Sequence, residues 1–220
     1  PVAANGFYKI ALDGKPDAII ILGPNHRGYG EDVSIMVEGK WRTPLGELEI
    51  DTNIAENILR NSKIIKNDKK AHQFENSIEV QLPFIQYIFG NQVKFIPISL
   101  TRQYIETDIE IAESICSSVV DKNILIIASA DFTHYEPQEY AVNIDMKAIN
   151  AILEFNPKKL YDMIYHQNLT MCGPGPVATM LIACKALGAK KAEFLKYATS
   201  GDISGMYDQV VGYASLIIRR

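Results

Sequence analysis

Short, continuous apolar runs alternate with stretches of helical periodicity along this chain, and this alternation constrains the fold more than any other feature. The runs "DAIIIL" (17–22), "VKFIPISL" (93–100) and "NILIIASA" (123–130) are bounded by turn residues and predict buried strands. Helices are expected between them and after them. Such an order predicts one α/β domain with helices on both faces of a central, mostly parallel or mixed sheet.

The remaining elements follow from caps, breakers and periodicity. Pro83 is expected to kink the helix in which it falls, and Pro97 suggests an edge position or a local irregularity of its strand. A turn at Gly39 is expected to join two shorter strands, 33–39 and 41–50, and two more strands close the chain at 192–200 and 210–220. The expected helices are 1–12, 51–62, 76–90, 107–120, 139–155, 157–167 and 175–188.

The composition narrows the class of protein. Of 220 residues, 47% are hydrophobic and 22% charged, which is ordinary for a globular core, and a net charge of −4 argues against nucleic acid as a partner. No window approaches the roughly 20 apolar residues of a membrane span. Three cysteines without a CxxC pair make a disulfide framework improbable, so a cytoplasmic protein is expected.

The start of the sequence suggests that it is a piece of something longer. Pro1 opens directly into a helical pattern, with no initiator methionine. We therefore expect a single domain over 1–220, from which an upstream N-terminal segment is missing. No internal repeat, linker or low-complexity segment divides it.

Four polar segments come directly after hydrophobic elements, where ligand sites of open α/β sheets gather. They are "GPNH" (23–26), "SADFTHY" (129–135), "NLTMCGPGP" (168–176) and "YATSGDISG" (197–205). His26 at the tip of the first segment could be an ordinary loop histidine bonded to backbone, and alone that interpretation is favoured. A histidine at a strand end is nevertheless placed to offer a ring nitrogen to a metal.

Asp131 and His134 lie three residues apart, so the carboxylate could orient the imidazole for acid/base work. The alternative, with Asp131 capping a turn and His134 exposed, is equally compatible with the pattern. Cys172 could be a small buried hydrophobe, but it precedes a helix N-terminus, where the dipole is expected to lower the thiol pKa.

Other ionisable residues are weaker candidates. Glu75 could cap the helix that follows it, and Glu79 would face the site if that helix points there. His72 is expected in a loop and His166 at a helix C-terminus. Cys116 and Cys184 fall among apolar residues of predicted helices, where a packing role is expected. The chain carries no GxSxG elbow, phosphate-binding loop, GxGxxG or HExxH motif.

Taken in order, six segments resemble the MEMO family, whose members are similar in fold to class III, LigB-type extradiol dioxygenases. The resemblance covers essentially the whole chain and implies a three-layer α/β/α fold with a metal pocket. The segments are "ILGPNH", "WRTPLGELEID", "ENSIEVQLPF", "SADFTHY", "MCGPGP" and "YATSGD" with "VVGYAS".

The resemblance also implies ligands. Its "GPxH" histidine corresponds to His26 and its "CGxxP" cysteine to Cys172, while its "PHAGY"-like histidine has no counterpart in this sequence. Asp131 and His134 match other pocket residues of the family, and Asn25, Glu75 and Glu79 are further pocket candidates. A thiolate in place of a carboxylate favours iron or copper, with zinc as a further possibility, in one mononuclear site.

Three functions stay open from the sequence. The leading hypothesis is a metal pocket with a redox or metal-handling role, in which His134 moves protons and Asp131 orients groups. The alternatives are a dioxygenase-like oxidoreductase acting on catechol-type substrates and a metal-independent module that binds a peptide or small ligand.

Overall fold

The central layer of the computed structural model, which describes all residues from Pro1 to Arg220, is a five-stranded mixed sheet. Its strand order is β5-β2-β6-β1-β7, with β1 parallel to both of its neighbours and β2 antiparallel to β6. Every residue of β1 is buried, as its continuous apolar sequence predicts. The bounds are β1 (Ala18–Pro24), β2 (Val33–Ile35), β5 (Lys66–Asn67), β6 (Lys94–Leu100) and β7 (Ile124–Ala128).

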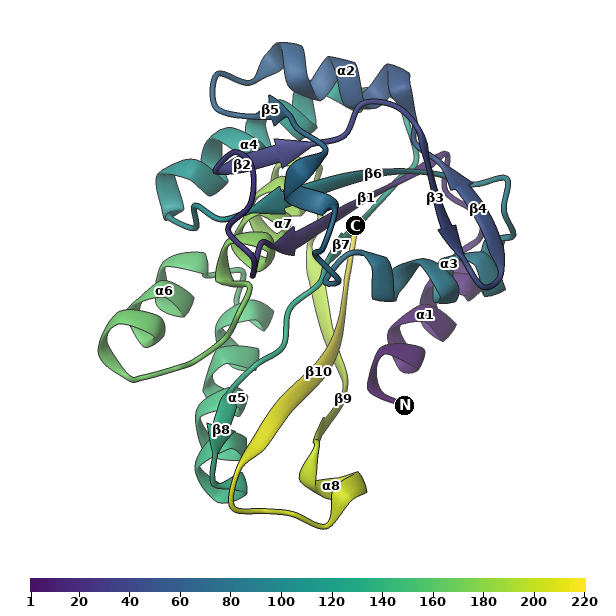
Figure 1. Cartoon of the computed structure of the whole chain (residues 1–220). Coiled ribbons are helices and arrows are strands. Elements are labelled where there is room, and N and C mark those ends of the chain that lie inside the picture. Colours follow the sequence, from purple (N-terminus) through teal and green to yellow (C-terminus); the bar gives the residue numbers. More distant parts are fainter.

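Helices flank this sheet and complete a three-layer α/β/α sandwich, as expected (Figure 1). On one side α7 (Pro174–Ala186) packs against β1, β7 and α4 (Ile105–Ser118), and α2 (Thr52–Asn61) packs against α4. Elsewhere α1 (Val2–Asp13) packs against α3 (Leu82–Phe89), where the rings of Phe7 and Phe84 stack 4.9 Å apart. The largest apolar core lies among these helices and the sheet.

A second, antiparallel sheet extends from the central one, with strand order β8-β10-β9 (Figure 1). Its strands are β8 (His134–Glu136), β9 (Lys191–Thr199) and β10 (Val210–Arg219), and α8 (Gly201–Ser204) lies between the last two. The helices α5 (Gln138–Leu153) and α6 (Pro157–His166) pack here around a separate apolar cluster. The two closing strands are thus confirmed, but they do not pair with the central sheet.

The prediction of a strand pair turning at Gly39 is wrong. The hairpin is formed instead by β3 (Lys40–Thr43) and β4 (Gly46–Glu49), with the turn at Pro44 and Leu45. The side chain hydroxyl of Thr43 accepts a hydrogen bond from the Leu45 N–H at 3.0 Å and so stabilises this turn. The preceding strand, β2, pairs instead with β6 in the central sheet, where all three of its residues are buried.

The helix expected over 76–90 is shorter than predicted. A 3₁₀ turn over Glu79–Gln81 precedes α3, just as another covers Lys70–His72, and α3 itself begins at Leu82. Pro83 therefore lies in the first turn of α3, where its missing N–H costs nothing, and it does not kink the helix.

Pro97 does not mark a sheet edge, since β6 lies between β1 and β2. The ladder of β2 ends opposite Ile98, and the next contact on that side is the bridge between Ile50 and Phe95. Pro97 falls in this gap, so no backbone donor is needed there. The edge strands of this sheet are β5 and β7, and the residues of β7 are all half-buried although a fully buried strand was expected.

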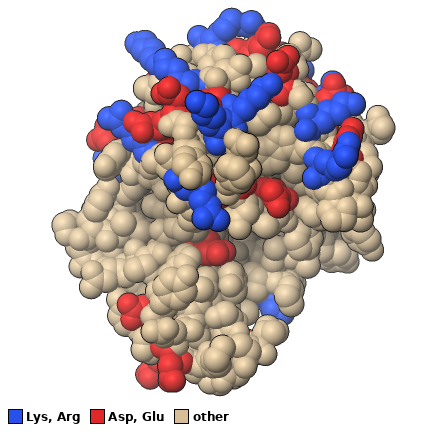
Figure 2. All heavy atoms as spheres, in the orientation of Figure 1, with Lys and Arg blue, Asp and Glu red and all other residues tan.

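Lys and Arg side chains are interspersed with Asp and Glu over the upper part of the face in Figure 2, and the lower part is mostly uncharged. No helix combines the length and apolarity needed to cross a bilayer.

Candidate functional site

His26 is presented by the loop that follows β1, and the neighbouring Asn25 shapes this loop. The Asn25 carboxamide oxygen accepts hydrogen bonds from the N–H groups of Arg27 at 3.2 Å and Gly28 at 3.0 Å, and its nitrogen donates to the Tyr29 carbonyl at 2.8 Å. These hydrogen bonds form an Asx turn, in which the Asn25 side chain both accepts from and donates to the backbone of the loop. Asn25 thus positions His26 from within the loop.

A buried carboxylate holds the imidazole of His26. Glu75, whose side chain is only 2% exposed, accepts hydrogen bonds from the His26 backbone N–H at 2.6 Å and from ring Nδ1 at 2.9 Å, and a third from the Ser77 N–H at 2.9 Å. Burial raises the pKa of Glu75, but these hydrogen bonds outweigh it and leave the pKa below its ordinary value. An ionised Glu75 fixes the proton on Nδ1, so Nε2 is the nitrogen left to bind a ligand.

Two hydrogen bonds join Asp131 and Cys172. The Asp131 N–H donates to the Cys172 sulfur at 3.2 Å, and the Cys172 N–H donates to the Asp131 carbonyl at 3.2 Å. Asp131 follows β7, the neighbour of β1 in the sheet, so the carboxyl ends of adjacent parallel strands bring Asp131 and His26 together as expected. Burial raises the pKa of Asp131, while the nearby charges of His134 and His26 lower it by less.

Two residues that sequence analysis missed hold the Cys172 loop in place. Gln103, which follows β6, donates to the Cys172 carbonyl at 3.1 Å and accepts from the Gly175 N–H at 2.9 Å. Gly173 fits so closely that an added Cβ would lie 2.7 Å from the Ala130 Cβ. No local pattern marks Gln103, because its partners are about 70 positions away. For Gly173 the only signal in the sequence was the pair of glycines in "CGPGP".

The expected depression of the Cys172 pKa is wrong. Burial raises the pKa of this thiol to about 11, and the carboxyl groups of Asp131 and Glu75 push it further in the same direction. The N–H of Asp131 opposes them but is outweighed. The thiol is therefore protonated at neutral pH unless a cation takes the place of its proton.

His134 lies in β8 with a defined ring orientation. Its Nδ1 lies 2.9 Å from the Thr170 carbonyl oxygen, which can only accept, so Nδ1 carries the hydrogen. The hydroxyl of Thr170 also accepts from the His134 backbone N–H at 2.7 Å. Nε2 is consequently the basic nitrogen of His134, on a side chain that is half-buried.

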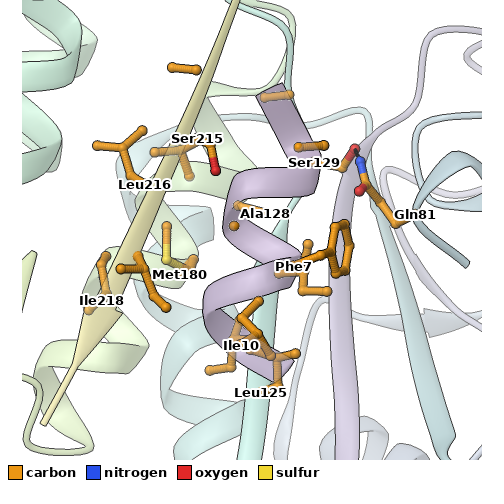
Figure 3. Close-up of a pocket in the computed structure, with 18 of the residues that line it drawn as sticks. Phe7, Ile10, Gln81, Leu125, Ala128, Ser129, Met180, Ser215, Leu216 and Ile218 are labelled. Atoms are coloured by element: carbon orange, nitrogen blue, oxygen red, sulfur yellow. Dashed lines mark hydrogen bonds between the residues drawn. The ribbon is translucent and has the colours of Figure 1, made fainter. Parts of the chain in front are cut away.

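His26, Asp131 and Cys172 all line one groove of about 760 Å³. The groove continues between β7 and β10, where Figure 3 shows Ala128 of β7 and Leu216 of β10. Glu79 is not brought to it: this residue is exposed in its 3₁₀ turn and lines a separate cavity beside Trp41.

The other candidates also lie apart from the three groove residues. His72 is buried against the Trp41 ring, and burial lowers its pKa to about 4. His166 is exposed in the last turn of α6. Cys116 is half-buried in α4, whereas Cys184 lines the apolar part of the groove from α7.

The donor set at the polar end of the groove is small. Nowhere in the chain do three His, Cys, Asp or Glu side chains gather closely enough to hold a metal ion. The site therefore offers one oriented imidazole and one thiol, with a carboxyl group beside them. An ion held by these residues alone has two protein ligands, which is fewer than stable sites use.

The chain is a layered α/β protein in which His26, Asp131 and Cys172 line one groove beside the carboxyl ends of β1 and β7. Residues 1–217 match the family of Memo-like proteins. A MEMO1 family protein of Methanopyrus kandleri is 45% identical over 222 residues, covering 100% of this chain and 78% of that relative. Another, from Desulfurococcus amylolyticus, is 48% identical over 218 residues, or 98% of this chain and 77% of the relative.

The chain belongs to the Memo-like family. A solved structure with a similar fold is an uncharacterized protein from Escherichia coli K12, with a TM-score of 0.62. The two are 12% identical, and the similarity covers 96% of this chain and 92% of the other. At that identity the comparison shows the fold alone.

Proposed function

We propose that this protein binds one transition-metal ion at the polar end of the groove and serves a redox or metal-handling role. His26 Nε2 and the Cys172 sulfur are two of the ligands. The observation that carries the proposal is the buried Glu75 carboxylate on His26 Nδ1, at 2.9 Å. A carboxylate on the far nitrogen is the arrangement that orients metal-binding histidines and makes them more basic.

The chemistry of the donors indicates which ions fit. A thiolate with an imidazole favours copper(I), zinc or iron over hard cations such as magnesium. Such a metal, when bound, supplies a Lewis acid or an electron carrier. Because the Cys172 thiol has a pKa of about 11, it must lose its proton on binding, so affinity rises with pH.

The remaining polar residues have separate tasks. Asp131 holds the Cys172 sulfur through its backbone N–H, and its carboxyl group has a raised pKa that lets it accept a proton more readily. His134, with Nδ1 held by Thr170, keeps Nε2 available to move a proton. Gln103 fixes the backbone on both sides of Gly173.

A metal analysis of purified protein tests the proposal. The chain is titrated anaerobically with Fe(II), Cu(I) and Zn(II), and bound metal is measured by mass spectrometry after gel filtration. His26→Ala and Cys172→Ser are expected to weaken binding at least about tenfold, the effect typical of site residues. His166→Ala and Cys116→Ser, which change the same residue types elsewhere, serve as controls. Undiminished binding by both site variants would show that the ion lies elsewhere.

A dioxygenase-like reaction is the second candidate, and the observation in its favour is the free Nε2 of His134 near Asp131. It predicts oxygen uptake by the Fe(II)-loaded protein with a catechol-type substrate, reduced in His134→Gln. No uptake over a catechol panel with iron bound would exclude it. A metal-independent binding module predicts instead that ligand binding survives Cys172→Ala.

A further inference from the structure

A second cavity, separate from the groove, lies beside the hairpin of β3 and β4. Its main walls are β3 and the segment between β5 and α3, which lie next to each other (Figure 1). It measures about 380 Å³, which is within the range of pockets that hold small molecules. Only 3 of its 11 lining residues are hydrophobic, so a polar or charged occupant suits it better than an apolar one.

Positive charge gathers in this cavity, although the chain as a whole carries a net charge of −4. Lys40 and Arg42 line it from β3, and Lys69 and Lys70 line it from the facing segment. Glu79 is the one acidic residue of the lining. Cations that share one concave site repel one another, and an anion bound among them relieves this repulsion.

The three lysines of the lining are not neutralised by neighbouring carboxylates. None of them takes part in an ion pair, whereas Arg42 is bound to Glu47 at 2.8 Å. Three lysines and one Glu79 therefore leave two unpaired positive charges in the cavity. A phosphate monoester carries about 1.5 to 2 negative charges near pH 7, so its charge matches this balance.

The backbone that carries two of these lysines is held in place. Asp68 accepts hydrogen bonds from the Lys70 N–H at 2.8 Å and, through its other carboxylate oxygen, from the Glu31 N–H at 2.9 Å. Gly30 approaches so closely that an added Cβ would lie 2.8 Å from the Ala71 nitrogen. A fixed backbone reduces the entropy that is lost when the lysine side chains bind a ligand.

An indole and an imidazole lie together beneath the charged residues. The rings of Trp41 and His72 are 5.7 Å apart, His72 is only 7% exposed, and no hydrogen bond of normal geometry reaches either of its ring nitrogens. Burial lowers its pKa to about 4, against smaller opposing effects of the Asp68 and Glu75 charges and of the Ser34 backbone. A negative charge in the cavity would act in the same direction as the two carboxylates and stabilise a proton on this ring.

We propose that this cavity binds a small organic phosphate. The ammonium groups of Lys69 and Lys70 on one side and of Lys40 on the other hold the phosphate group through charge-assisted hydrogen bonds. The cavity has room for a carbon skeleton beside the phosphate, and the ring of Trp41 offers that skeleton an apolar surface. The binding requires no metal at the polar end of the groove.

Tryptophan fluorescence tests the proposal directly, because Trp41 is the only tryptophan of the chain and lines the cavity. The purified protein is titrated, with a chelator present, with ribose 5-phosphate and glycerol 3-phosphate, and with ribose and glycerol as their phosphate-free counterparts. The two phosphates should change the fluorescence saturably, and the effect should weaken as salt is added. Ribose and glycerol should leave it unchanged, and inorganic phosphate should bind more weakly than ribose 5-phosphate.

Substitutions of opposite charge separate ligand binding from a structural effect. The double variant Lys69→Gln, Lys70→Gln should weaken binding of ribose 5-phosphate at least about tenfold, because charged hydrogen bonds are lost. Glu79→Gln should strengthen binding about two- to fivefold, because a like charge is removed. The double variant Lys158→Gln, Lys159→Gln changes two adjacent exposed lysines of α6 and should bind as the parent does.

Three results would overturn the proposal. They are no saturable change with either phosphate, equal binding of ribose and ribose 5-phosphate, and undiminished binding in the variant that lacks both lysines. His26→Ala and Cys172→Ser should bind ribose 5-phosphate as the parent does. Loss of binding in them would place the phosphate at the polar end of the groove and would also contradict a separate site, whereas failure of the metal proposal leaves this one standing.

Discussion

Strands β1 and β7 lie side by side with nearly the same sequence, yet their surroundings differ. "AIIIL" at the start of β1 is fully buried between two partner strands, whereas "ILIIA" of β7 has one partner and is half-buried throughout. Both lead at their carboxyl ends into the site, β1 to His26 and β7 to Asp131. The comparison teaches that an apolar run identifies a strand that needs covering, and the neighbouring elements decide whether it is covered.

The largest expected effect is on the closed strand. Ile20 of β1 is 0% exposed, and Ile20→Ala should lower the free energy of unfolding by about 3–4 kcal/mol, because the lost contacts leave a cavity that rigid neighbours cannot fill. Urea denaturation measures this. A loss below about 1 kcal/mol would mean that β1 is not tightly packed.

A buried carboxyl group in α4 should have an effect of similar size. Asp108 of α4 is fully buried, accepts a hydrogen bond from the Tyr161 hydroxyl at 2.6 Å, and has its pKa raised by burial to about 7. A raised pKa means that the folded state holds the proton more tightly, so Asp108 costs stability as pH rises from about 4 to about 7. That cost is up to about 4 kcal/mol.

Asp108→Asn should therefore gain stability relative to the parent at pH 8 and little at pH 4, in urea unfolding at the two pH values. Asp162→Asn, at an exposed position of α6, should show no such difference. A gain that does not depend on pH would show that the carboxyl group keeps its ordinary pKa.

The third prediction concerns the site at the end of β1. Glu75→Gln keeps the shape of the side chain but removes the negative charge of the carboxylate that accepts a hydrogen bond from His26 Nδ1. Metal affinity should therefore fall about 10- to 100-fold with the fold intact. Glu79→Gln, in a turn outside the groove, should bind as the parent does. Equal affinities in the two variants would remove Glu75 from the metal site.

The smallest effect is expected on the open strand. Ile126 is paired in register with Ile20, so Ile126→Ala makes the same chemical change one strand away. Since its side chain is already half-exposed in the groove, the loss should be about 1–2 kcal/mol, below that of Ile20→Ala. A loss as large as that of Ile20→Ala would mean that the groove wall is packed like the core.

Local sequence was sufficient for much of this fold and for half of the site. Apolar runs and caps predicted the strands and helices. Polar residues after strand ends indicated His26 and Asp131, and the family resemblance added Cys172, which lines the same groove. The hydrogen bond between Glu75 and His26 joins residues 49 positions apart, and those of Gln103 to the Cys172 loop join residues about 70 positions apart. No local sequence pattern predicts such contacts. The open edge of β7 and the raised pKa of Cys172 depend on burial, which only the assembled fold determines.

The most direct test of whether His26 and Cys172 bind one ion is to measure whether Zn(II) protects Cys172 from an alkylating reagent. Zn(II) is chosen because it has no redox chemistry. It should slow alkylation of Cys172 in the parent and not in His26→Ala, while Cys116 in the same molecules reacts equally with and without zinc. Equal protection of Cys172 in both proteins would contradict a site shared by His26 and Cys172.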